Sequence, residues 1–189
     1  MRPQPISQNA RASAEAEAAL LGILFQDPDT LRHVRPFLRP HHFSEPLHER
    51  LYGALEEEAD RGSGFNPMTV AARFSGEPAM IELGGMGYIG LLIANAPPSE
   101  SAGDCAKAVF DAAIRSNIAV ICAEGLRAAT EGSEEAFGIA SATRERLETL
   151  AHEAATDDDS MVPAPEVAER AIEAMQEKAV HGRSRGYLT

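Results

Sequence analysis

Three prolines in the first seventy residues each follow a residue that can cap a helix and precede apolar residues at helical spacing. They stand in Asp27-Pro28, Ser44-Glu45-Pro46 and Asn66-Pro67. Aspartate, serine and asparagine accept hydrogen bonds from the free N–H groups of a first helical turn, and proline is tolerated there because it has no N–H to lose. These three points therefore predict helix starts. The apolar residues that follow them are Leu31 and Val34, then Leu47, Leu51 and Leu55, then Met68, Val70, Ala71 and Phe74.

An earlier helix is predicted from Ser13, as its N-cap, to Phe25. Its apolar face consists of Ala16, Ala19, Leu20, Ile23 and Leu24. Four helix starts thus precede residue 70, and no sequence pattern there indicates a β-hairpin. A short apolar helix over residues 88–93 follows the turn Gly84-Gly85-Met86-Gly87. The predicted fold class is all-α, with a globular helical domain over residues 13–98.

Residues 99–155 show the pattern of two long helices. No proline occurs between residues 100 and 130, and the next helix is predicted to begin after a turn at Glu131-Gly132-Ser133. Ala136, Ala140, Thr143, Leu147, Leu150 and Ala154 recur at spacings of four and three. That spacing is typical of a coiled-coil seam. Two long helices joined by so short a turn predict an antiparallel helical hairpin.

This hairpin can either protrude from the globular domain or complete its helical bundle. Protrusion is favoured because residues 13–98 already supply helices for a core of their own. A protruding seam needs a partner, and a second copy of the chain is the expected one. The residues predicted for self-association are Phe110, Ile114, Ile118, Ile121, Leu147 and Leu150.

Residues 156–189 predict an acidic linker followed by a separate helix. Three consecutive aspartates lie between Thr156 and Ser160, and Pro163 and Pro165 stiffen the join. The helix predicted from Ala164 to His181 is amphipathic, so its apolar stripe needs a groove to cover it. A groove on a neighbouring subunit is favoured, and folding back onto the chain's own bundle is the alternative. The predicted docking residues are Val167, Ala171, Ile172, Met175 and Ala179.

The charge balance argues against direct DNA binding by the isolated chain. Its formal net charge is −12, and its only lysines are Lys107 and Lys178, so no basic stripe faces a phosphate backbone. Cys105 and Cys122 are too few for a disulfide framework and are predicted to be reduced core residues of a cytoplasmic protein. No apolar run approaches the roughly 20 residues that span a bilayer, so no membrane association is expected. Residues 1–12 are polar and predict a flexible tail.

No sequence pattern supports catalysis or the binding of a metal or cofactor. A P-loop needs a lysine followed by serine or threonine, but Ala108 and Ala179 follow the two lysines. The four histidines between residues 33 and 48 lack the companions of a converging zinc site, and they are predicted to be surface or capping residues. Consecutive glutamates point in different directions around a helix and cannot converge on one substrate. The chain itself is therefore not expected to be an enzyme.

An ordered series of motifs resembles the amino-terminal domain of DnaB-type replicative DNA helicases. The series covers Ser13 to Ile118, and its order is more specific than any one motif. Gly186-Tyr187-Leu188-Thr189 is similar to the Gly-x-x-Thr that precedes the ATPase domain in this family. The motifs are Ser13 to Gly22 with its Glu-Ala-Glu and Leu-Gly, Asp27-Pro28, Phe43, His48-Glu49-Arg50-Leu51, Asn66 to Val70, Gly84-Gly85 with Tyr88, Asn95-Ala96-Pro97, Ala106-Lys107 and Val109.

The resemblance implies a six-helix globule, a helical hairpin over residues 99–155 and a linker helix within residues 156–189. In the family these domains pair and form a collar of three dimers on a hexameric ring. The linker helix docks on the ATPase domain of the neighbouring subunit, and primase and helicase loader act at the collar. ATP and Mg are expected only for the ATPase motor domain, before which the chain is expected to stop.

The leading hypothesis is an oligomerisation and partner-docking domain of a hexameric replicative helicase, in which DNA unwinding and ATP hydrolysis belong to the full-length protein. The alternative is a stand-alone replication adaptor or helicase-loading protein that uses the same fold. A small helical enzyme with an unrecognised site is the least favoured hypothesis.

Overall fold

The structure is a computed structural model that describes residues 8–61, 66–132 and 135–159, and every regular element in these ranges is helical. The all-α prediction is confirmed. In chain order the elements are α1 (Gln8–Gln26), the 3-10 helix η1 (Pro28–Thr30), α2 (Leu31–Val34), η2 (Pro40–His42), α3 (Pro46–Arg61), α4 (Pro67–Arg73), α5 (Pro78–Glu82), α6 (Met86–Ala94), η3 (Ser99–Ser101), α7 (Ala102–Glu131) and α8 (Ala136–Asp159).

The predicted proline starts are confirmed. Pro28, Pro46 and Pro67 are the first residues of η1, α3 and α4. Before α4, the Asn66 side chain accepts a hydrogen bond of 3.0 Å from the Met68 backbone N–H, which is the capping role expected of it. Asp27 stands at the corresponding position of η1 but makes no such side-chain bond.

Two helix boundaries and one additional helix differ from the predictions. Helix α1 begins at Gln8 rather than at Ser13, so residues 8–12 belong to a helix and not to the predicted flexible tail. Pro78 begins a short helix, α5, that no apolar repeat indicated. Helix α8 continues to Asp159 through the segment predicted as an acidic break. This segment contains neither proline nor glycine, the residues that most strongly end helices.

The core of the globular part is built around α1. Leu20, Leu21 and Leu24 are fully buried, and α1 packs against α7, α6 and α3. The first three turns of α7 enter the same core through Ala102, Ala106 and Val109. Burying such side chains stabilises the fold by roughly 1.5–3 kcal/mol for each large residue. The globule therefore holds the base of α7 firmly.

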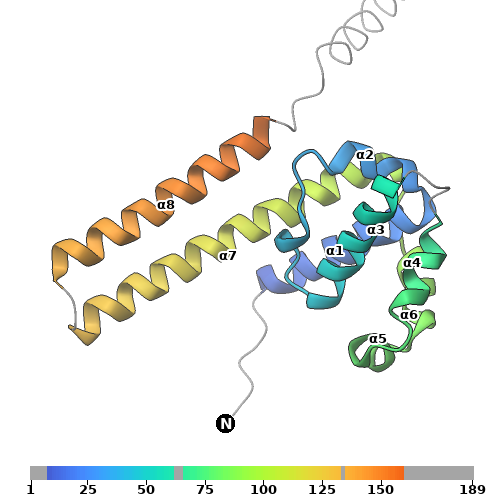
Figure 1. Ribbon diagram of the computed structural model, residues 1–189, viewed down its shortest axis with the longest axis horizontal. Coiled ribbons are helices and arrows are strands. Elements are labelled where there is room, and N and C mark those ends of the chain that lie inside the picture. The colour runs from blue at the N-terminus through green and yellow to red at the C-terminus, as the bar shows by residue number, and fades with distance from the viewer. Residues whose placement is uncertain (1–7, 62–65, 133–134, 160–189) are drawn as a thin grey trace, which may run out of the picture.

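Beyond this core the two longest helices leave the globule together. Figure 1 shows α7 running outward from the body formed by α1 to α6, with α8 returning beside it in the opposite direction. Helices α7 and α8 pack against each other, as the predicted hairpin requires. The helix predicted over 164–181 lies outside the described residues.

Candidate interaction surface

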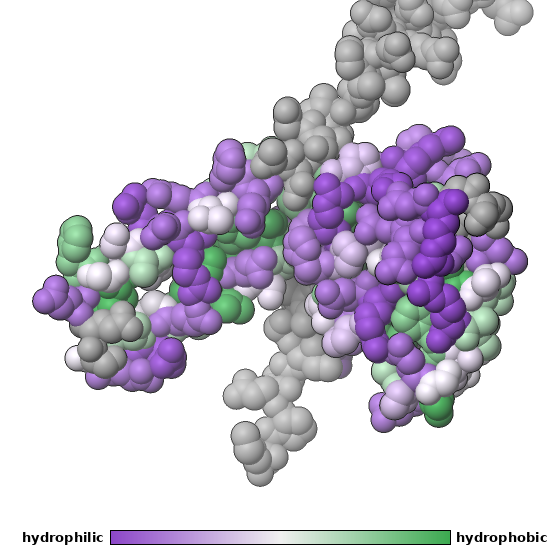
Figure 2. Space-filling model, in the orientation of Figure 1, coloured by the Kyte–Doolittle hydropathy of each residue, from purple (hydrophilic) through white to green (hydrophobic). Residues whose placement is uncertain are grey.

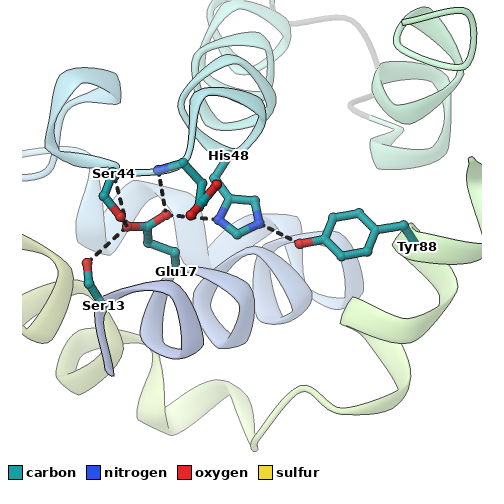
Figure 3. Close-up of polar contacts among 6 residues, drawn as sticks. Ser13, Glu17, Ser44, His48 and Tyr88 are labelled. Carbon is teal, nitrogen blue, oxygen red and sulfur yellow. Dashed lines mark hydrogen bonds and ion pairs between the residues drawn. The ribbon is translucent and has the colours of Figure 1, made fainter. Parts of the chain in front are cut away.

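The Glu-Ala-Glu motif near the start of the chain places a carboxylate in the core. The Glu17 side chain is fully buried. It extends from α1 toward the loop before α3 and toward α3 itself (Figure 3). Its Oε1 accepts hydrogen bonds from the Ser13 hydroxyl at 3.0 Å, the Ser44 hydroxyl at 2.6 Å and the Ser44 N–H at 2.8 Å. A buried charge needs such partners to offset the loss of water.

His48 extends this network toward the surface. Its Nδ1 lies 2.9 Å from Glu17 Oε2, and its Nε2 lies 2.5 Å from the Tyr88 hydroxyl on α6. Figure 3 shows the imidazole lying between the carboxylate and the phenol. The prediction of a surface or capping role for His48 is wrong, because its ring is buried and joins three helices. The helix pattern could not reveal this, since the partners lie 31 and 40 residues away.

The electrostatics of this cluster favour a structural role. Burial alone raises the pKa of the Glu17 carboxyl, but hydrogen bonds from His48 and Ser44 outweigh it, and the pKa lies below its usual range. A stable carboxylate that takes part in five hydrogen bonds, the fifth from the Glu45 backbone N–H, has no free lone pair aimed at a substrate. The cluster therefore fixes α1, α3 and α6 relative to one another.

His42 does fulfil the predicted capping role. Its Nδ1 accepts the Arg39 backbone N–H at 3.0 Å, and its ring packs edge-on against Phe110 with centroids 5.0 Å apart. Burial lowers the pKa of His42 to about 4, and the nearby His41 and Arg39 act in the same direction. The ring is therefore neutral near pH 7. Across the described residues no group of His, Cys, Asp or Glu side chains is arranged to hold a metal ion.

The hairpin has a seam of close contacts along its length. Ile121 on α7 and Leu150 on α8 are buried and line the same hollow between the two helices. A Cβ on Gly125 would stand 2.9 Å from the Thr143 hydroxyl oxygen, so the axes approach closely there. Arg146 and Glu124 form an ion pair across the two helices.

The same hairpin leaves large apolar side chains uncovered. Ile118 is 42% exposed, Val120 49%, Leu126 67% and Phe137 85%. A shallow groove of about 630 Å³ follows one side of the hairpin. In Figure 2 hydrophobic surface gathers between the two arms and near their outer end. The groove is lined by Cys122, Gly125, Leu126, Ala140, Thr143, Arg144, Leu147, Glu148 and Ala151.

The six residues predicted for self-association fall into three environments. Phe110 is buried in the globular core, with its ring centroid 6.4 Å from that of Phe37, and Ile114 packs against the same core. Ile121 and Leu150 are buried within the hairpin. Leu147 is half-buried in the groove, and Ile118 is exposed. Phe110 is therefore unavailable to a partner.

The predicted set of self-association residues omitted several exposed apolar residues. Val120, Leu126 and Phe137 lie off the coiled-coil spacing. A second patch lies on the globule, where Ile81 and Leu91 are 60% and 59% exposed and Leu83 and Met86 lie between them in the sequence. Figure 2 shows hydrophobic surface at this end of the body, below α4. The sequence signal that could have indicated this patch is the group of apolar residues on both sides of Gly84-Gly85.

The two cysteines are free, and Cys122 is exposed. The prediction that it lies in the core is wrong, because at that point α7 has left the globule and Cys122 faces the groove. Cys105 is half-buried. In the described part of the chain, no helix is both long and apolar enough to cross a membrane.

Residues 9–111 match the family described as DnaB-like helicase N terminal domain. A replicative DNA helicase DnaB from Rickettsia felis is 30% identical over 131 residues, which are 69% of this chain and 26% of that protein. The Geobacillus stearothermophilus replicative DNA helicase DnaB is 36% identical over 87 residues, which are 46% of this chain and 19% of its own length. The chain thus matches only about a quarter or less of these relatives.

A solved structure shows the same arrangement of helices. The crystal structure of the N-terminal domain of DnaB helicase from Mycobacterium tuberculosis superposes with a TM-score of 0.63 at 25% sequence identity. The match covers 71% of this chain and 96% of that domain.

Proposed function

The chain belongs to the DnaB-like helicase N-terminal domain family, and from this membership we propose that it is the self-association and partner-docking domain of a replicative DNA helicase. Two copies associate through their hairpins. In the full-length protein, three such dimers form a collar on a hexameric ring. DNA unwinding and ATP hydrolysis belong to the motor domain of that full-length protein.

The observation that carries this proposal is the uncovered apolar surface of the hairpin. Leu126 and Phe137 are 67% and 85% exposed on the two helices of the hairpin, which extends beyond the globule. Soluble monomers rarely leave large apolar side chains grouped in this way. A second hairpin laid along the groove covers the same residues on both copies, as a two-fold interface requires.

The patch of Ile81, Leu83, Met86 and Leu91 is the surface that we propose for primase or a helicase loader. It lies on the globule, at the opposite end of the molecule from the hairpin tip (Figure 2). A partner bound there leaves the hairpins free to pair. The two roles thus fall on separate surfaces and can be tested by separate substitutions.

Analytical ultracentrifugation of the native chain and of Ile118→Asp and Leu147→Asp tests the self-association. Each substitution places a charge in the proposed interface, so both variants are expected to sediment as monomers at concentrations where the native chain is dimeric. Circular dichroism confirms that the variants are folded. Unchanged masses for both folded variants contradict the hairpin interface.

A further inference from the structure

A second groove lies where α7 leaves the globule, on a different side from the hairpin groove. Its volume is about 620 Å³, roughly four times the cavity of about 150 Å³ that takes a benzene-sized molecule, so it has room for several side chains. Its walls are the start of α1, the η2 loop and one face of α7. The lining includes Ala12, Ser13, His41, Phe43, Ala108 and Ala112.

We infer that this groove receives the apolar stripe of residues 164–181 of the same chain. Alanines form half of the α7 wall, at positions 108, 112, 113 and 119. Side chains at the contact set how closely two helices approach, so an alanine wall admits a helix at short distance. The stripe of the segment, Val167, Ala171, Ile172, Met175 and Ala179, is of the size that such a groove accepts.

Positive charge next to the groove in the sequence complements the segment. Arg115 lines the groove together with Asp111, with which it forms an ion pair of 2.6 Å. Arg11 and Lys107 directly precede the lining residues Ala12 and Ala108, and neither forms an ion pair within the described part of the chain. Among the lining residues, Arg115 and Asp111 are thus an oppositely charged pair, and Arg11 and Lys107 add two positive charges next to the lining in the sequence. Residues 164–181 carry four glutamates against Arg170 and Lys178.

The hairpin brings the segment within reach of the groove. Asn117 and Glu153 line the same hollow between α7 and α8, so these residues lie at the same level of the antiparallel pair. Both helices rise 1.5 Å per residue. Six residues further along, Asp159 therefore lies level with Asp111, which is itself a groove residue.

The connection from α8 to the segment is long enough to pass around α7. Five peptide units join Asp159 to Ala164, and fully extended they reach about 17 Å. A helix with its side chains is about 10 Å across. The connection also keeps the segment at high effective concentration near the groove, which favours the chain's own segment over that of another copy.

Docking in this groove and docking on a neighbouring subunit use the same stripe, so the two states exclude each other. The inference stands apart from the proposed self-association, because it concerns the monomer. A lone helix of eighteen residues is marginal in water. Protection of its amides against hydrogen exchange therefore reports docking.

Hydrogen exchange measured by mass spectrometry on the full chain, over a dilution series that includes the monomer, tests the inference. Amides of residues 164–181 are expected to be protected at every concentration. Ala108→Glu, which puts a charge in the groove, is expected to lower this protection on the order of tenfold, and so is Ile172→Asp in the segment. Ala129→Glu is the matched control, because Ala129 is equally exposed on α7 but far from the groove, and it keeps the protection.

Each other outcome overturns the inference. Exchange of these amides at the unprotected rate in the native monomer shows that nothing holds the segment. Protection that remains in Ala108→Glu shows that the segment is held elsewhere. Protection that appears only when the chain dimerises shows that the segment of a second copy fills the groove. Amides of α1 and α3 serve as the internal check that all variants are folded.

Discussion

Gly22 on α1 lies directly against the backbone of Leu92 on α6: a Cβ added to Gly22 would stand 2.2 Å from the Leu92 carbonyl oxygen. Neither helix can move away easily, because the atoms in contact belong to the backbones of α1 and α6. The Leu-Gly of the family motif is thus explained by a crossing of two helices at a distance that only glycine permits. The buried Glu17 network fixes the same pair of helices one turn and a half earlier in α1.

Gly22→Ala is expected to lower the free energy of unfolding by about 3 kcal/mol, because the clash outweighs the roughly 1 kcal/mol that alanine gains in helix propensity. Urea denaturation measures the difference. The matched control is Gly53→Ala on α3, where the new Cβ meets Pro40 Cγ at an ordinary 3.5 Å. This control is expected to stabilise by about 0.5–1 kcal/mol. Equal stability of Gly22→Ala and the native chain would show that α1 and α6 are further apart.

Glu17→Gln is expected to destabilise the chain at neutral pH by about 2–4 kcal/mol, since an amide cannot accept all the hydrogen bonds that the carboxylate accepts. The pKa of Glu17 is lowered in the fold, so its contribution is complete above the usual carboxyl range. That contribution is lost as the pH falls through the lowered pKa. The difference between the variant and the native chain therefore shrinks in acid. Glu15→Gln, on the exposed side of α1, is the control and should leave the stability unchanged.

The titration of His42 predicts a second acid dependence. Its pKa is lowered to about 4, whereas an unfolded histidine titrates near 6.5. Between these values the unfolded chain binds the proton and the folded chain does not, so stability rises with pH and is complete above about 6.5. The total effect is on the order of 3 kcal/mol. NMR of the imidazole resonances should give a midpoint near pH 4 for His42, and a midpoint near 6.5 would contradict its burial.

Substitutions at Phe110 and at Ile118 should differ in their effect on the stability of the fold, although the two residues lie on the same apolar stripe of α7. Phe110→Ala is expected to lower the free energy of unfolding by about 3–5 kcal/mol, because it empties a core site beside Phe37 and His42. Ile118→Ala removes a side chain that is 42% exposed and should cost less than about 1 kcal/mol. Thermal unfolding of both variants checks this. Equal losses would show that the core extends along the hairpin.

The same pair shows how far sequence patterns reach. The spacing of Phe110, Ile114, Ile118 and Ile121 predicted the helix and its apolar side correctly, because period alone decides that. It could not tell that α7 passes from the globule into the hairpin near Ile114, because the change depends on which helices lie beside it. Polar residues were harder. The sequence suggests an N-cap at Ser13 and a surface residue at His48, whereas both bind the Glu17 carboxylate, Ser13 from four residues away and His48 from 31.

Sedimentation equilibrium of the native chain, Leu126→Asp and Leu91→Asp tests most directly whether the uncovered hairpin surface pairs two copies. The two leucines are similarly exposed, at 67% and 59%, so neither change disturbs the core. We expect a monomer–dimer equilibrium for the native chain and for Leu91→Asp. Leu126→Asp should weaken it by about two orders of magnitude, since the charge enters a symmetric interface twice. A native chain that stays monomeric at high concentration, or a Leu126→Asp variant that dimerises as well as Leu91→Asp, would contradict pairing through the hairpin.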